Sequence, residues 1–183
     1  VEKELDRNIE MFKQMKVEEK MKQAIEDLDK LQKEQEKLAQ QSEQPNSDPK
    51  DIKEKQDELN KKMEDLMKQM EEIKKENKEL EDPKDIADTK KEAEEVQKEQ
   101  KEGSENLGKN QKSKASKNQK KAAEKMKEMK DKMEENMAEM ESKELEEDIA
   151  TLRGILENLI QLSYDQEALM KDLQTINNYS PQF

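Results

Sequence analysis

The chain has 183 residues, of which 29% are hydrophobic, 2% are aromatic and 46% are charged, and its formal net charge is −12. So few apolar residues cannot form the compact globular core that is usual for this length. The absence of Cys and His removes the thiol nucleophile, common zinc ligands and the side chain that titrates near neutrality. This composition is typical of long charged helices whose apolar residues recur at helical spacing.

The first predicted helix spans residues 1–42. Its apolar positions begin at Leu5 and Ile9, and from Met21 onward they follow one another in steps of three and four residues. Residues 42–47 contain turn formers and no periodicity, which predicts that the helix ends there in a loop.

The second predicted helix spans residues 48–81. Asp48 can accept hydrogen bonds from free backbone amides, and Pro49 suits the first helical position. A heptad pattern then continues without interruption over Ile52, Gln56, Leu59, Met63, Leu66, Met70, Ile73, Asn77 and Leu80. Asn77 falls at a core position of this seam, where a buried amide commonly fixes the register of paired helices.

The third predicted helix spans residues 82–102, because the pentapeptide at the start of the second helix recurs unchanged from Asp82 to Ile86. The two helices are then separated by a tight reversal. Gly103, Ser104 and Gly108 predict the end of this helix, which has the thinnest apolar stripe.

The fourth predicted helix spans residues 112–177 and changes character along its length. Its first half presents a thin seam of Ala115, Gln119, Ala122, Met126, Met129, Met133, Met137 and Met140. Its second half carries a wide stripe of Ile and Leu from Ile149 to Ile176. The most apolar stripes lie near the two ends of the chain. We therefore expect residues 145–176 to pack against the first helix and to form the main hydrophobic core with it.

The predicted fold is therefore all-α: a long antiparallel coiled coil or elongated helical bundle of about four helices that together form one unit. Core packing is the favoured role for the Met126 to Met140 seam, because spacings of three and four are what a core requires. An adaptable surface for varied partners is the alternative.

A lysine-rich segment is the sharpest charge feature. It holds Lys109, Lys112, Lys114, Lys117, Lys120 and Lys121 without an acidic residue. Residues 112–132 carry a net charge of +6, whereas residues 133–183 carry −9. The segment could bind an anionic surface or protein, face solvent, or pair with acidic segments of the same chain. The absence of Arg and aromatic residues from it, and the charge of −12 on the whole chain, disfavour nucleic acid.

No catalytic, metal-binding or cofactor-binding residue is predicted, and we expect no enzyme activity. Carboxylates on solvated helices lack the cleft that separates the pKa values of an acid and a base. The chain has no calcium loop, Gly-rich phosphate loop or nucleophile elbow. No run approaches the roughly 20 apolar residues of a membrane span, so none is expected in this segment.

Five ordered segments together resemble a bacterial family of very large proteins. They are residues 9–13, 17–20, 114–123, 147–153 and 156–167. The family is a domain of unknown function with transmembrane helices near its N-terminus, followed by long coiled-coil stretches. The resemblance implies a membrane-anchored parent protein in the cell envelope, on a side of the membrane that it does not specify. A start without Met and an end at Phe183 likewise suggest an excised fragment.

The functional interpretation is a structural or scaffolding segment that contacts other proteins or associates with itself. One alternative is a holdase-like clamp whose Met-lined helical arms hold unfolded proteins. The other is binding to an anionic surface through Lys109 to Lys121.

Overall fold

A computed structural model describes the backbone of residues 2–179 and the side chains of residues 3–174. Within that range it contains four α-helices and no strand, which confirms the all-α prediction. The helices are α1 (Glu2–Glu43), α2 (Pro49–Lys78), α3 (Lys90–Gly108) and α4 (Lys112–Tyr179). The chain divides into a first unit, residues 1–138, and a second unit, residues 139–183, and the boundary falls inside α4.

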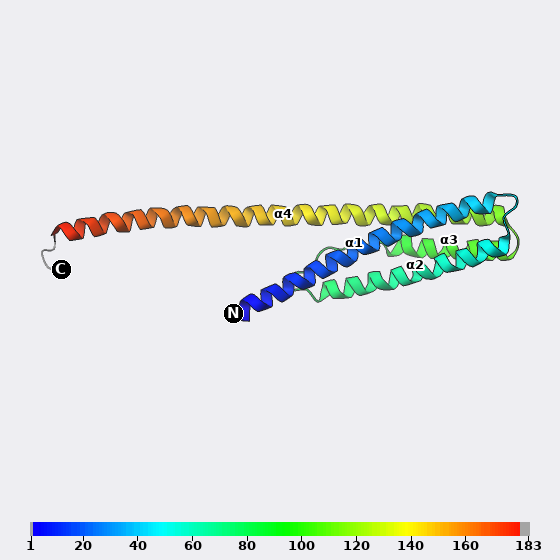
Figure 1. The fold of residues 1–183 in the computed structure, drawn as a ribbon, viewed down its shortest axis with the longest axis horizontal. Coiled ribbons are helices and arrows are strands. Elements are labelled where there is room, and N and C mark those ends of the chain that lie inside the picture. The colour runs from blue at the N-terminus through cyan, green and yellow to red at the C-terminus, as the bar shows by residue number, and fades with distance from the viewer. Residues whose placement is uncertain (1, 180–183) are drawn as a thin grey trace. The chain divides into compact units, whose positions relative to one another are not determined.

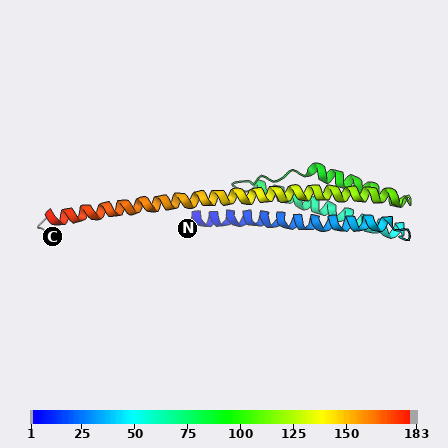
Figure 2. The same cartoon turned by 90° about the horizontal axis from the view of Figure 1, so that it is seen from above.

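The first unit is a four-helix bundle in which each helix runs antiparallel to the one before it (Figure 1, Figure 2). Its members are α1, α2, α3 and residues 112–137 of α4. Polar contacts join each neighbouring pair of helices, including the pair of first and last: Lys62–Glu34, Ser104–Asp57, Lys125–Glu95 and Lys130–Asp29. This is the up-and-down topology that short connections favour.

The core of the bundle is built from modest side chains. Buried apolar residues of α1 run from Val17 to Ala39, and those of α2 run from Ile52 to Ile73. The Met seam of α4 closes the core: Met126, Met129, Met133 and Met137 are 0–7% exposed. The core role predicted for these methionines matches their burial.

The prediction that residues 145–176 cover α1 is wrong for the buried part of that helix. Its stripe is closed by α2, α3 and the first part of α4 instead. Ser116 donates to the carbonyl of Ala39 at 3.2 Å, and Lys130 pairs with Asp29 at 3.0 Å. The physical reason is that thin Ala and Met positions fit the narrow space between four close helices, so the most hydrophobic segment is not needed there.

A layer of four buried glutamines, one from each helix, crosses the bundle. Its members are Gln35, Gln56, Gln100 and Gln119, and they are 0–1% exposed. Gln35 and Gln56 donate to each other at 2.8 and 3.0 Å. Gln100 donates to Gln35 at 3.0 Å, and Gln119 donates to Gln56 at 3.0 Å. We call this set the glutamine layer.

The glutamine layer is anchored further by neighbours on two helices. Gln56 also donates to Asn60 at 2.9 Å, and the Ser42 hydroxyl donates to Gln119 at 2.6 Å. The Oε1 atom of Gln100 is buried without a hydrogen-bond partner. A buried amide network of this kind disfavours other helix registers, because a slipped helix would leave several amides without partners in an apolar core.

The start of α2 matches its prediction. Asp48 accepts a hydrogen bond from the amide of Lys50 at 2.9 Å, and Pro49 occupies the first helical position. The helix ends at Lys78, three residues before the predicted end.

The predicted start of the third helix is wrong: α3 begins at Lys90, and residues 82–89 form a non-helical connection. Asn77 donates to the carbonyl of Lys84 at 2.8 Å and accepts from its amide at 3.0 Å. Asn136 donates to the carbonyl of Asp85 at 2.8 Å and accepts from the amide of Ala87 at 2.9 Å. These bonds satisfy the backbone outside a helix, so an identical pentapeptide adopts two conformations in one chain.

The predicted end of the third helix is also wrong, because α3 continues through Gly103 to Gly108. Ser104 donates to Asp57 at 2.8 Å and accepts from Asn60 at 3.1 Å, and Leu107 is buried. These tertiary contacts outweigh the roughly 1 kcal/mol that a glycine costs inside a helix. The turn into α4 then passes through Asn110, which has a positive φ of 57°.

Candidate interaction surfaces

Half of the lysine-rich segment makes contacts within the first unit. Lys112 donates to the carbonyls of Gln44, Pro45 and Ser47 at 2.9–3.1 Å, and so closes the turn between α1 and α2. Lys120 pairs with Glu43 of α1, and Lys121 lies 3.5 Å from Glu99 of α3. The pairing with acidic segments of the same chain, one of the alternatives raised by the sequence, therefore accounts for these three lysines.

The remaining lysines of this segment are Lys109, Lys114 and Lys117, and all three are exposed. No ion pair is found for them within the described part of the chain. Exposed lysines that keep their hydration are the ordinary surface of a charged helix. The structure thus leaves three of the six residues as a candidate anionic-partner patch.

The basic character of the first part of α4 continues beyond this segment. Lys125 pairs with Glu95 at 3.1 Å, and Lys132 pairs with Glu92, both on α3. Lys130 pairs with Asp29 on α1. Five of the nine lysines of residues 112–132 therefore face acidic side chains on the two neighbouring helices, which helps to explain why this stretch is basic in an acidic protein.

Asn77 lies at the buried seam position that the heptad predicts and is 6% exposed. Its amide bonds to the backbone of Lys84 in the connection after α2, not to a side chain on a facing helix. Asn77 therefore binds the connection between α2 and α3. Its effect on the register of the paired helices stays a prediction.

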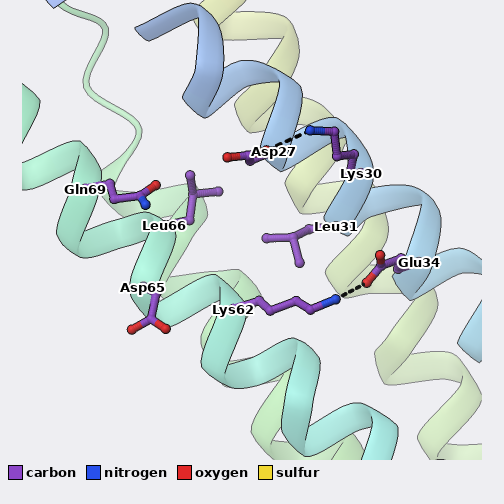
Figure 3. A pocket seen from close by; sticks show the side chains of 8 residues that line it. All are labelled: Asp27, Lys30, Leu31, Glu34, Lys62, Asp65, Leu66 and Gln69. Carbon is purple, nitrogen blue, oxygen red and sulfur yellow. Dashed lines mark hydrogen bonds and ion pairs between the residues drawn. The ribbon is translucent and has the colours of Figure 1, made fainter. Parts of the chain in front are cut away.

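A shallow groove lies between α1 and α2 (Figure 3). Its floor is formed by Leu31 and Leu66, which are buried between the two helices. Charged side chains form its rim, and Lys62 of α2 pairs with Glu34 of α1 at 2.7 Å. Leucines below and ion pairs above are the usual cross-section of a charged helix pair, so the groove is explained by the packing of α1 against α2.

An apolar face lies exposed on α4 in the second unit. Twelve large hydrophobic residues between positions 145 and 173 are 43–65% exposed. They are Leu145, Ile149, Leu152, Ile155, Leu156, Leu159, Ile160, Leu162, Tyr164, Leu169, Met170 and Leu173. We call these residues, without Tyr164, which lies in the outward row of Glu157 and Lys171, the apolar face. The predicted member Ile176 lies outside the described side chains.

The apolar face has a heptad arrangement. Ile149, Leu156 and Met170 share one heptad position. Leu145, Leu152, Leu159 and Leu173 share the position three residues later, so the two sets form the a and d rows of a coiled coil, which Ser163 and Gln166 interrupt. Ile155, Leu162 and Leu169 recur every seven residues in the adjacent g row and widen the stripe on one side.

A smaller apolar group is exposed at the start of α1 in the first unit. Leu5, Ile9, Met11, Phe12 and Met15 are 47–69% exposed. They precede Val17, where the buried stripe of α1 begins. The first turns of α1 therefore extend outside the bundle core.

Membrane and metal sites were also sought among the described residues. None of the helices there has a stretch apolar and long enough to cross a bilayer. The same residues contain no cluster of three or more acidic side chains arranged to hold a metal ion.

Comparisons with known proteins add no relative. No protein-family model, no curated protein and no solved structure matches the chain.

Proposed function

We propose that this chain is a non-enzymatic structural segment that mediates protein–protein contact through the apolar face of α4. In this proposal the four-helix bundle is a stable folded domain that carries the binding segment, and residues 145–173 bind another helix. The observation that carries the proposal is the exposure of twelve large hydrophobic side chains on one stretch of helix.

The energetics support a packing partner for this face. Burying one large aliphatic side chain is worth about 1.5–3 kcal/mol, and soluble proteins rarely expose contiguous apolar patches beyond a few hundred Å². A helix without tertiary contacts is also only marginally stable in water. A second helix laid along the face would therefore stabilise both the side chains and the helix that carries them.

The resemblance to membrane-anchored bacterial proteins supports a setting for this contact. In that setting the chain belongs to the cell envelope, in the part of the parent protein that lies outside the bilayer. A coiled-coil stretch beside a membrane anchor suits assembly with neighbouring proteins, because the anchor raises their effective concentration.

The burial of the Met seam argues against the clamp-like alternative. Met126, Met129, Met133 and Met137 point into a closed core rather than into an open space between arms. Likewise, the engagement of Lys112, Lys120 and Lys121 within the chain weakens the anionic-surface alternative.

Site-specific photo-cross-linking in the native cells tests the proposal. A photoreactive amino acid replaces Leu156 at the centre of the apolar face. The matched control replaces Glu157, the next residue. It occupies heptad position b, which points away from the side of the helix that carries the a and d rows. We expect irradiation to produce a discrete adduct from position 156 and a much weaker one from position 157.

Equal adduct formation at the two positions, or none at either, would overturn the proposal. The first result would mean that contact is not specific to the apolar face. The second would mean that no protein packs on it in the cell.

A further inference from the structure

We propose that the apolar face of α4 packs against the same face of a second copy of this chain, in antiparallel orientation and with Leu162 of one copy facing Leu162 of the other. This inference rests on the proposed function and names the partner. It is carried by the distribution of apolar and charged residues around the second unit's helix.

The two flanks of the apolar face differ in a way that favours an antiparallel pair. In a parallel pair each g row faces the partner's e row, whereas in an antiparallel pair g faces g and e faces e. The g row is apolar, with Ile155, Leu162 and Leu169, while the e row is mixed, with Arg153, Ile160, Glu167 and Gln174. Only the antiparallel arrangement pairs all three g-row side chains with one another, because in a parallel pair Ile155 alone would face an apolar e-row residue, Ile160.

A parallel pair would also bring unlike flanks together at a cost. Leu162 would then face Glu167 of the second copy, and Leu169 would face Gln174. An apolar side chain gains little from such a contact, and the carboxylate loses hydration.

The charges along the helix favour the same orientation. Residues 139–148 contain six acidic side chains and one lysine, whereas residues 149–174 contain four acidic and two basic ones. Parallel copies would place the two acidic segments side by side. Antiparallel copies separate them and place residues 143–148 of each beside residues 174–179 of the other copy, which contain no charged residue.

One register satisfies both the apolar g row and the charges, and its a and d rows pair Ile149 with Leu173 and Leu152 with Met170, while Ser163 and Gln166 lie in the rows near its centre. With the two-fold axis level with Gln161, Leu162 faces Leu162 of the second copy, Ile155 faces Leu169, and Arg153 faces Glu167 in an oppositely charged pair. Because the axis repeats every contact, this ion pair forms twice. A slip by one heptad toward the N-terminus would instead place Glu146 opposite Glu167 and lose this complementarity.

The chain's lack of cysteine allows a direct test by single-cysteine cross-linking. Leu162→Cys should cross-link efficiently to the second copy with a short thiol-specific reagent. Leu145→Cys should not, because in the antiparallel register it lies opposite position 177, and the two copies of residue 145 are about 48 Å apart at 1.5 Å per residue. Circular dichroism checks that both variants keep their helicity.

Charge reversal tests the register in the full chain by sedimentation equilibrium. Arg153→Glu and Glu167→Arg should each weaken dimerisation roughly threefold to tenfold, the range for exposed ion pairs. The double exchange should restore it. Glu157→Arg, in the outward b row, is the matched control and should have a smaller effect.

Cross-linking of Leu145→Cys together with Leu162→Cys would overturn the antiparallel orientation. A chain that stays monomeric and forms no cross-link at either position would overturn self-association altogether. That result would leave the proposed function standing if Leu156 still gave a photo-adduct with a different protein in cells. Loss of the photo-adduct at position 156 as well would overturn both the self-association and the proposed function.

Discussion

At the scale of single residues, the least expected feature is the glutamine layer. The heptad pattern places Gln35, Gln56, Gln100 and Gln119 in the seams of their helices. It does not reveal that all four meet at one level, because that depends on how far each helix is shifted along its neighbours. Their mutual hydrogen bonds identify the level at which the four helices align.

The glutamine layer predicts a large difference between two similar substitutions. Gln56→Leu removes the partner of Gln35 and Gln119 and should lower the free energy of unfolding by about 2–4 kcal/mol, because buried amides lose their bonds. Gln100→Leu removes the member whose Oε1 has no partner, and should change stability by less than about 1 kcal/mol. Denaturant unfolding measures both. Equal costs would show that the layer does not act as a hydrogen-bonded network.

Carboxylates at the helix interfaces carry a second prediction at this scale, concerning acid stability. The hydrogen bond from Lys132 holds the pKa of Glu92 below its ordinary 4.5, and that from Lys20 lowers the pKa of Glu76. A carboxyl whose pKa is lowered by folding stabilises the folded state above its unfolded pKa. This contribution is lost as the pH falls through the folded pKa, so the melting temperature should fall below about pH 4.5.

Glu92→Gln should lower the melting temperature at pH 7 and reduce its further fall at acid pH. Glu64→Gln, at an exposed position of α2, is the control and should follow the unsubstituted chain. A melting temperature that rises on acidification would mean that relief of repulsion at a net charge of −12 outweighs the interface ion pairs.

At the scale of elements, local sequence predicted the helices better than their ends. The capped start at Asp48 is correct because its signal is local: a side chain that accepts from the next free amide, followed by a proline. The same five residues at Asp82 do not start a helix, because Asn77 and Asn136 bind the backbone there. Asn136 is distant in sequence, and no local pattern could have identified it.

The connection before α3 gives a prediction about these asparagines. Asn136→Ala leaves the carbonyl of Asp85 and the amide of Ala87 without their partner, and should destabilise the bundle by about 1–2 kcal/mol. Hydrogen exchange at the Ala87 amide should become faster. Glu135→Ala, at the adjacent exposed position, should leave that exchange rate unchanged. Unaltered exchange in the Asn136 variant would mean that other contacts hold the connection.

At the scale of the whole molecule, the sequence correctly predicted four antiparallel helices. It wrongly predicted that the most apolar segment, residues 145–176, is buried against the first helix. The strongest apolar stripe, from Leu145 to Leu173, is exposed, while a thinner seam of Ala and Met is buried. Periodicity shows that a helix has an apolar side but does not say what covers it. The candidate interaction surface was therefore visible in the sequence as a pattern and was interpreted as core.

The first unit contains the buried core and the second unit carries the exposed apolar face, so a truncation can test whether the first unit is stable by itself. A chain that ends at Ala138 retains every buried layer of the first unit, including Met126, Met129 and Met133. Its melting temperature should stay within about 3 °C of that of the full chain, which corresponds to roughly 1 kcal/mol or less. If residues 145–176 packed against α1 as part of the core, the truncation should instead cause α1 to unfold or aggregate.

Two point substitutions in the full chain make the same distinction without removing any residue. Met129→Ala should cost about 2–5 kcal/mol of bundle stability, because it opens a cavity in a core position that is 0% exposed. Leu156→Ala should leave the bundle transition unchanged and weaken only association through the apolar face. Thermal unfolding measured with a probe in the bundle separates these effects from dimerisation, which depends on protein concentration. If Leu156→Ala lowered the bundle transition as much as Met129→Ala does, the second unit would be part of the core rather than a surface for another chain.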